Sequence, residues 1–306
     1  MHSPKHSPKD LRDCWVGANP IIWSNDDFNE LAGDVPLDAI LRDMRAVGYS
    51  GTELGHAYPR TATALCPHLE KHQLRLVSGW HSTYLATRSL EQERASFAAH
   101  LRLLKPLGAT VAIVAECSHA IHGDRNAALG YGVDDRRTLT SDEWTRLVAG
   151  LSELATTCAS EGMKLVYHHH MGTVIQTEAE LDRLLASVPN LHLVLDAGHL
   201  SFAGIDPHAV VSRHGDRIGH VHLKSTRASV VAQARREGWS FCKAVSSGVF
   251  TIPGDGEVDY VRLLRELSAL PYRGWLVVEA EEDPGLVPAL PKAKKAREFV
   301  RQHAGV

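Results

Sequence analysis

The chain has 306 residues, of which 44% are hydrophobic and 23% are charged, and its formal net charge is −3 at pH 7. This weakly acidic balance argues against nucleic acid as the main partner, and no run approaches the roughly 18 apolar residues that a membrane span needs. The polar segment over residues 1–12 contains no apolar stretch of the kind found in signal peptides, so we expect a mobile N-terminal arm and a cytoplasmic protein.

Short apolar runs alternate with amphipathic segments from residue 13 to the end of the chain. Eight of these runs have the length and composition of strands. They lie near 15–22 and at 49–54, 73–80, 109–116, 163–169, 191–197, 217–224 and 274–281. Eight β/α units in a chain of this length predict a single-domain (β/α)8 TIM barrel over residues 13–306. A doubly wound open sheet is the alternative, but no GxGxxG motif follows the first strand.

The segments between the strands show the periodicity of helices. Between residues 141 and 162 the apolar residues recur on one helical face, and Ser141 is the expected N-cap. The two longest irregular segments are 117–140 and 225–255. Each follows a strand, so we expect both to be loops on the face where barrels build their active sites.

Side chains that bind metal ions stand at the ends of the last four predicted strands. Alternation along a strand places the members of three pairs on one side: His168 with His170, His220 with His222, and Glu279 with Glu281. We expect one member of each pair to be a ligand and the other to face the substrate or support the ligand. Together with Asp196, these imidazoles and carboxylates suit a divalent ion such as Zn, Mn, Fe or Co. Because strand ends converge at one mouth of a parallel barrel, the sequence predicts a metal site there.

Polar and aromatic residues near the same strand ends are candidates for substrate contacts. Carboxylates suit the hydroxyl groups of a polyhydroxylated ring, and an indole suits its C–H face. A histidine three residues beyond Asp196 can reach a substrate oxygen or a second metal ion, and a lysine or arginine can bind hydroxyls or oxyanions. Each candidate has a structural alternative, either an ion pair or a solvated loop position. The candidates are Glu53, Trp80, His81, Glu116, His199, Lys224 and Arg227.

The motifs around these residues carry a family resemblance. GYSGTELG, LRLVSGWHSTYL, YHHHMGT, LDAGHL, RIGHVHLK and GWLVVEAEEDP together resemble the inosose dehydratases of myo-inositol catabolism, which belong to the xylose-isomerase-like sugar-phosphate isomerase/epimerase barrels. The likeness runs from about Val16 to Glu282. It implies a metal-dependent hydro-lyase that removes water from scyllo-inosose, a cyclic polyol ketone, to give a trihydroxycyclohexane-dione.

The resemblance also implies roles for individual residues. Asp196, His222 and Glu279 match the ligands that the superfamily takes from strands six to eight, whereas its strand-five glutamate is His168 here. This exchange removes a carboxylate that related isomerases use as a proton-transfer base. The resemblance favours Mn or Co as the metal, and the ligands also permit Zn. We expect His170 or His199 to move protons, Glu116 and Lys224 to hold or protonate oxygens, and Glu53, Trp80, His81 and Arg227 to bind the substrate.

Three alternatives use parts of the same pattern. A ketose or sugar-phosphate isomerase or epimerase would keep the strand-five carboxylate. A phosphodiesterase like the repair endonucleases of this superfamily would need two or three metal ions and a basic groove, which the net charge of −3 does not favour. A non-catalytic sugar-binding protein would need no proton-transfer groups. For any of these, exposed barrel helices and loops lead us to expect a homo-oligomer.

Overall fold

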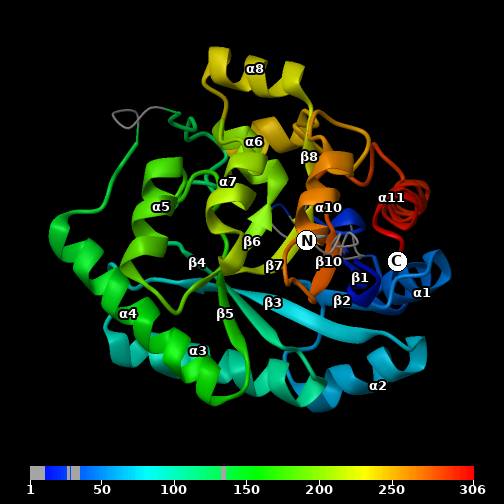
Figure 1. The fold of residues 1–306 in the computed structure, drawn as a ribbon, viewed down its shortest axis with the longest axis horizontal. Helices are drawn as coiled ribbons and strands as arrows, with labels where there is room; N and C mark the ends of the chain where they lie inside the picture. Colours follow the sequence, from blue (N-terminus) through cyan, green and yellow to red (C-terminus); the bar gives the residue numbers. More distant parts are fainter. Residues whose placement is uncertain (1–10, 26–27, 29–34, 132–135) are drawn as a thin grey trace, which may run out of the picture.

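The computed structural model describes residues 11–25, 28, 35–131 and 136–306. Within this part of the chain, eight parallel strands close into a barrel in the order β1-β10-β7-β6-β5-β4-β3-β2, which confirms the predicted (β/α)8 fold (Figure 1). These strands are β1 (Trp15–Ala18), β2 (Gly51–Leu54), β3 (Arg75–Thr83), β4 (Val111–Glu116), β5 (Lys164–Tyr167), β6 (His192–Asp196), β7 (Ile218–Leu223) and β10 (Trp275–Val278).

Helices surround the barrel and connect its strands (Figure 1). The α-helices are α1 (Leu37–Val47), α2 (Ala62–His72), α3 (Leu90–Leu104), α4 (Ser141–Ser160), α5 (Glu178–Ser187), α6 (Ala197–Ala203), α7 (Pro207–His214), α8 (Ala228–Glu237), α9 (Phe241–Ser246), α10 (Tyr260–Ser268) and α11 (Ala289–Ala304). Short 3₁₀ helices are η1 (Leu11–Asp13), η2 (Pro20–Ile22), η4 (Lys105–Leu107) and η6 (Gly215–Arg217). Among the described helices, none combines the length and the apolar character that crossing a membrane requires.

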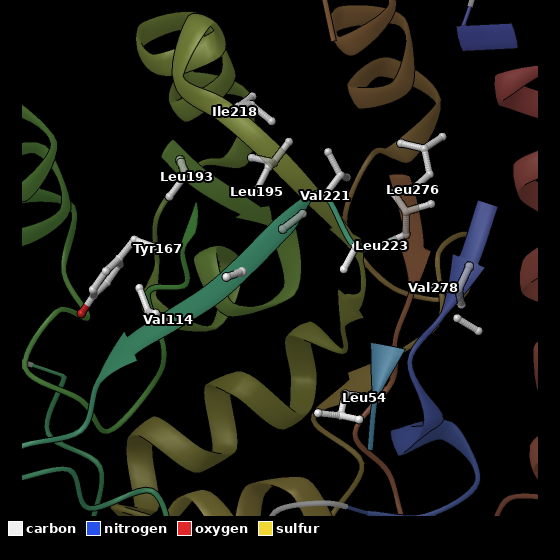
Figure 2. Packing of buried hydrophobic residues seen from close by; sticks show 14 of the residues in the cluster. Leu54, Val114, Tyr167, Leu193, Leu195, Ile218, Val221, Leu223, Leu276 and Val278 are labelled. Atoms are coloured by element: carbon white, nitrogen blue, oxygen red, sulfur yellow. The ribbon is translucent and has the colours of Figure 1, made fainter. Parts of the chain in front are cut away.

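The side chains of the strands alternate between two apolar layers. Leu193 and Leu195 on β6 face the layer between the barrel and its helices (Figure 2). Val194 lies between them and packs inside the barrel. Because successive side chains point to opposite faces of a strand, Asp196 is directed inward like Val194. The same alternation on the neighbouring strands selects which residues reach the interior.

The start of α4 differs from the prediction by one residue. Thr140, not Ser141, is the N-cap: its Oγ1 accepts a hydrogen bond from Glu143 N at 3.3 Å, and Glu143 Oε2 accepts one from Thr140 N at 2.9 Å. This reciprocal arrangement requires a glutamate three residues after the cap, a spacing that only Thr140 has here.

Segment 225–255, expected to be a loop, is a small folded insertion. Strand β8 (Ser225–Thr226) pairs antiparallel with β9 (Phe250–Thr251), and α8 and α9 lie between them in the chain. Apolar side chains of the insertion, including Phe241 and Phe250, form a second buried cluster with Met171. The helices are too short for their periodicity to be conspicuous in the sequence.

Most of the predicted N-terminal arm, residues 1–10, lies outside the described residues. Its last two residues, Leu11 and Arg12, belong to η1, and Leu11 is buried in the main core.

Candidate metal centre and active site

Four side chains from neighbouring strands converge at the C-terminal mouth of the barrel. Asp196 ends β6, His222 lies in β7, and His168 and Glu279 directly follow β5 and β10. His168 Nε2 lies 3.3 Å from Asp196 Oδ2. His222 Nδ1 lies 3.4 Å from the same oxygen and 2.7 Å from Glu279 Oε2. All four side chains are buried, so the structure brings the predicted ligand set together.

In His168 and His222, one ring nitrogen donates a hydrogen bond away from the cluster. The other nitrogen therefore carries the lone pair and faces the cluster. His168 Nδ1 lies 2.6 Å from the backbone oxygen of His169, which only accepts, so the lone pair of His168 is on Nε2. His222 Nε2 lies 3.1 Å from Glu53 Oε1, which places the ligating lone pair of His222 on Nδ1. Metal-binding histidines are commonly oriented in this way by a carbonyl or carboxylate partner.

The donor set fits a divalent ion. His222 Nδ1 and Glu279 Oε2 approach to 2.7 Å, yet among the described residues neither atom has a hydrogen bond of suitable angle. Two polar atoms that lie this close without forming a hydrogen bond have the arrangement expected of two ligands that bind the same ion. Two imidazoles and two carboxylates are typical donors for first-row divalent metals.

The cluster also holds a buried ammonium group. Lys224 Nζ lies 3.1 Å from both Asp196 Oδ2 and Glu279 Oε1, and 2.7 Å from Glu281 Oε1. Burial alone would lower the pKa of Lys224, but these three carboxylates raise it well above its usual value. Lys224 is absent from the residues that line the cavity, so the geometry does not support its predicted contact with a substrate oxygen. Its positive charge instead offsets the buried carboxylates.

Glu53 points into the barrel, but both of its carboxylate oxygens are occupied. Oε1 accepts from His220 Nε2 at 2.8 Å, from His222 Nε2 at 3.1 Å and from Ser78 Oγ at 2.6 Å. Oε2 accepts from Asn19 Nδ2 at 2.7 Å. Glu53 lines the cavity, so its contact with a substrate hydroxyl stays a prediction, and its carboxylate also lies in position to orient His222.

His170, His199 and Glu281 form a second group beside the ligand set. His199 Nε2 lies 3.3 Å from Glu281 Oε1, and the rings of His170 and His199 are 4.0 Å apart. Burial is the main cause that lowers the pKa of both histidines well below the usual value, so both are neutral. His170 Nδ1 lies 2.8 Å from the backbone oxygen of Met171, which leaves a lone pair on Nε2. A neutral imidazole with a free lone pair can accept a proton, and the lowered pKa makes it a weaker base than an exposed histidine.

A cavity of about 320 Å³ opens beside these groups. His168, His170 and the carboxylate of Glu279 are in its wall, together with Trp80. The indole ring of Trp80 contacts the His168 ring edge-on at 5.4 Å. The cavity combines an aromatic surface with several polar groups, which suits a small polyhydroxylated ring.

Glu116 does not belong to this site. Its carboxylate accepts hydrogen bonds from Thr83 Oγ1 at 2.9 Å and from the backbone N–H groups of Leu85, Ala86 and Ser118 at 3.0, 3.3 and 3.2 Å. Thr83 is the last residue of β3, and the other donors belong to the loops that follow β3 and β4. Glu116 therefore fastens two loops, and its predicted catalytic role is not supported.

Two predicted substrate-binding residues also lie away from the cavity. His81 follows the inward-facing Trp80 and points the opposite way, where its ring lies 5.5 Å from that of Phe97 on α3. Arg227 Nη1 donates to the backbone oxygens of Gly248 and Phe250 at 2.8 and 2.9 Å. His81 is thus a packing residue, and Arg227 holds the insertion together.

Other cavity residues are absent from the predicted set. Asn19 follows β1 directly, and Ser82 is two positions beyond Trp80 on the same side of β3. Both positions have a signal in the sequence, namely the strand end and the two-residue spacing. His122 lies within segment 117–140, where no periodicity indicates which side chains point inward.

Comparisons with known proteins agree with this architecture. Residues 41–303 match the family described as xylose isomerase-like TIM barrel. The chain is 40% identical over 293 residues to the inosose dehydratase of Geobacillus thermodenitrificans, which covers 95% of this chain and 97% of that protein. It is 41% identical over 302 residues to the rhizopine catabolism protein MocC of Rhizobium meliloti, with 98% and 92% covered. The crystal structure of the IolI protein with a bound zinc atom has a TM-score of 0.64 and 15% identity, covering 95% of this chain and 98% of that chain, so this likeness concerns the fold alone.

Proposed function

Because the chain belongs to the xylose isomerase-like TIM-barrel family and, within it, to the inosose dehydratases, we propose that it is a hydro-lyase acting on scyllo-inosose. The reaction removes a proton from a carbon next to the ketone and a hydroxyl group from the adjoining carbon. Its products are water and a trihydroxycyclohexane-dione. The observation that carries the proposal is the pairing of a convergent ligand set with a neutral imidazole, His170, in the wall of one cavity.

His168, Asp196, His222 and Glu279 hold a divalent metal ion in this proposal. When bound, the ion supplies Lewis-acid stabilisation for negative charge on the ketone oxygen. The strand-five position is a histidine rather than a carboxylate, and the family favours Mn or Co, with Zn also compatible with these donors.

His170 is the group proposed to move the proton. The sequence leaves His170 and His199 as alternatives, and the cavity wall favours His170 because His199 is not among the lining residues. The hydrogen bond from Nδ1 to the backbone oxygen of Met171 directs the lone pair of Nε2 away from that loop. Nε2 takes the proton from carbon, and the resulting imidazolium can return it to the departing hydroxyl group as water forms.

The test combines a product assay with metal analysis. Purified protein reconstituted with Mn or Co is incubated with scyllo-inosose, and the absorbance of the diketone is followed. Alanine variants of the four proposed ligands should lose bound metal and turnover together. His170→Gln should keep the metal but lose about 10²- to 10⁴-fold in kcat, as expected for removal of a proton-transfer group.

His208→Ala is the matched control, because the ring of His208 pairs with Glu266 at 2.7 Å on the outside of the barrel. It should leave metal content and kcat unchanged. Full turnover by ligand variants that have lost the metal would contradict the proposal. Isomerisation of the inosose without loss of water would instead support the isomerase alternative. Cytoplasmic location and homo-oligomeric assembly remain predictions from the sequence.

A further inference from the structure

We propose that His122 is a substrate-binding residue that hydrogen-bonds one ring hydroxyl of the inosose and so contributes to the choice of substrate. The inference rests on the proposed function, and it concerns a residue outside the ligand set and outside the proton-transfer group.

The backbone at His122 is held against the loop that carries His170. The N–H of Ile121 donates to the backbone oxygen of Gly172 at 2.8 Å. Gly172 has a φ of +76°, and a Cβ at that position would lie 2.9 Å from the backbone nitrogen of His122. The two loops therefore approach closely at a point where only glycine fits without strain. His122 is thereby placed at a fixed position relative to His170.

The side chain of His122 lies in the wall of the cavity, together with His168 and His170. Its ring meets the His170 ring edge-on at 4.9 Å and is nearly perpendicular to the ring of Phe241 at 6.4 Å. These two contacts fix the plane of the imidazole. Nδ1 is buried, so Nε2 is the nitrogen that a molecule in the cavity can reach.

Neither nitrogen of His122 forms a hydrogen bond to any residue that the structure describes, and Nδ1 is buried. A buried polar atom without a partner is costly, so such atoms usually meet a ligand or an ordered water molecule. His119 on the same loop shows the opposite case, because its Nε2 lies 2.9 Å from Glu143 Oε1. Of these two histidines, His122 alone faces the cavity, and its hydrogen-bonding capacity is unused.

The chemistry of a neutral imidazole matches a hydroxyl group. Burial lowers the pKa of His122, so the ring presents one N–H donor and one lone pair. A hydroxyl both donates and accepts, so it can pair with the accessible Nε2 in either tautomer of the ring. The carboxylate of Glu53, which lines the same cavity, differs from His122 because it only accepts hydrogen bonds and already has partners at both oxygens.

The experiment compares scyllo-inosose with its monodeoxy analogues on the wild type and on His122→Phe. Phenylalanine keeps the ring contacts with His170 and Phe241 and removes both nitrogens. Loss of one neutral hydrogen bond is expected to lower kcat/KM about tenfold. The wild type should show that loss with one particular deoxy analogue. The His122→Phe variant should show the roughly tenfold lower kcat/KM already with the complete substrate. Its kcat/KM should not fall further with that deoxy analogue. His122→Gln, which retains a donor and an acceptor, should recover part of the activity.

His119→Phe is the control and should discriminate between the substrates as the wild type does. Metal content and unfolding temperature of each variant separate a local effect from misfolding, and His122→Leu, which also lacks hydrogen-bonding groups, replaces His122→Phe if the latter does not fold. If the loss in kcat/KM from His122→Phe multiplied with the loss from each missing hydroxyl, so that the variant converted every deoxy analogue less well than the complete substrate, the role of His122 would be overturned. The proposed function would remain intact. A wild type that neither binds nor converts any inosose would overturn both.

Discussion

The buried ammonium group of Lys224 offers a direct test of how charge is balanced in the site. Its Nζ lies within 3.1 Å of Asp196 Oδ2 and Glu279 Oε1 and 2.7 Å from Glu281 Oε1, and the side chain is fully buried. Lys224→Met keeps most of the apolar stem of the side chain and removes the ammonium group, with its charge and its N–H donors. Three carboxylates then lose a cationic neighbour in a site that excludes water.

Removing one partner of a buried ion pair typically costs about 3–5 kcal/mol, because the remaining charge is left uncompensated. For a chain of this size each kcal/mol corresponds to about 2–4 °C, so the unfolding temperature of the metal-free variant should fall by roughly 6–20 °C. A bound divalent ion would supply positive charge to Asp196 and Glu279, two of the three carboxylates concerned. The loss of stability should therefore be clearly smaller with saturating Mn than with a chelator.

Thermal unfolding of the wild type and Lys224→Met, each with EDTA and with Mn, measures this difference. Lys243→Met is the control, since Lys243 is exposed and its Nζ lies over the ring of Trp239 at 5.2 Å. The control should shift little in either condition. Equal destabilisation of Lys224→Met with and without the metal ion would refute the reasoning, and so would the absence of destabilisation.

Two further substitutions test the surroundings of the site and of the fold. Glu53→Gln should weaken metal binding about 10- to 100-fold, because the carboxylate orients His222, and competition with a chelator measures the change; unchanged affinity would contradict this role. The backbone N–H of Thr140 and then His119 lower the pKa of Glu143 from 4.5 to about 2, so the carboxylate adds stability above pH 4.5 that is lost as the pH falls towards 2. Glu143→Gln should therefore unfold about 1 kcal/mol more easily at neutral pH, with the difference vanishing near pH 2 in urea titrations, whereas a difference independent of pH would exclude this origin.

The fold was predictable because its signals are local. Strands of a parallel barrel are buried on both faces, so each appears as a nearly continuous apolar run. The proposed metal ligands stand at the ends of such runs, and barrel closure brings those ends together without further information. His168, Asp196, His222 and Glu279 could therefore be grouped, although the first and the last are far apart in the chain.

Glu116 and His81 were predicted to reach the site but do not, because each lies on the side of its strand that faces away from the barrel interior. Glu116 is two positions beyond Val114, and Val114 faces the helices (Figure 2). His81 is adjacent to the inward-facing Trp80 and therefore faces outward. Because β4 reads Val-Ala-Ile-Val-Ala before Glu116, both of its sides are apolar. The side chains of a strand alternate between its two faces, but the sequence of β4 does not indicate which of the two faces points into the barrel.

Other roles depend on partners that are distant in the sequence. His222 is oriented by Glu53, which lies 169 positions away in the chain. Lys224 at the mouth of a barrel is equally compatible with binding an oxyanion or with offsetting buried carboxylates. Only the position of Glu281, 57 residues later, shows that the ammonium group already has its acceptors. Such roles are set by tertiary packing, and a single sequence does not reveal them.

The histidine at strand five changes the charge of the proposed metal site. An imidazole ligand such as His168 carries no charge, so Asp196 and Glu279 are the only two anionic members of the four-residue set. A glutamate at this position, as in the related isomerases, would add a third. Because Lys224 and its partner Glu281 offset each other, two carboxylate ligands would just balance a bound dication, whereas a third would make the site negative and disfavour negative charge on the ketone oxygen. In the proposed mechanism the same residue position also matters for the base, because a histidine there lacks the carboxylate of the isomerase alternative and proton transfer is assigned to His170.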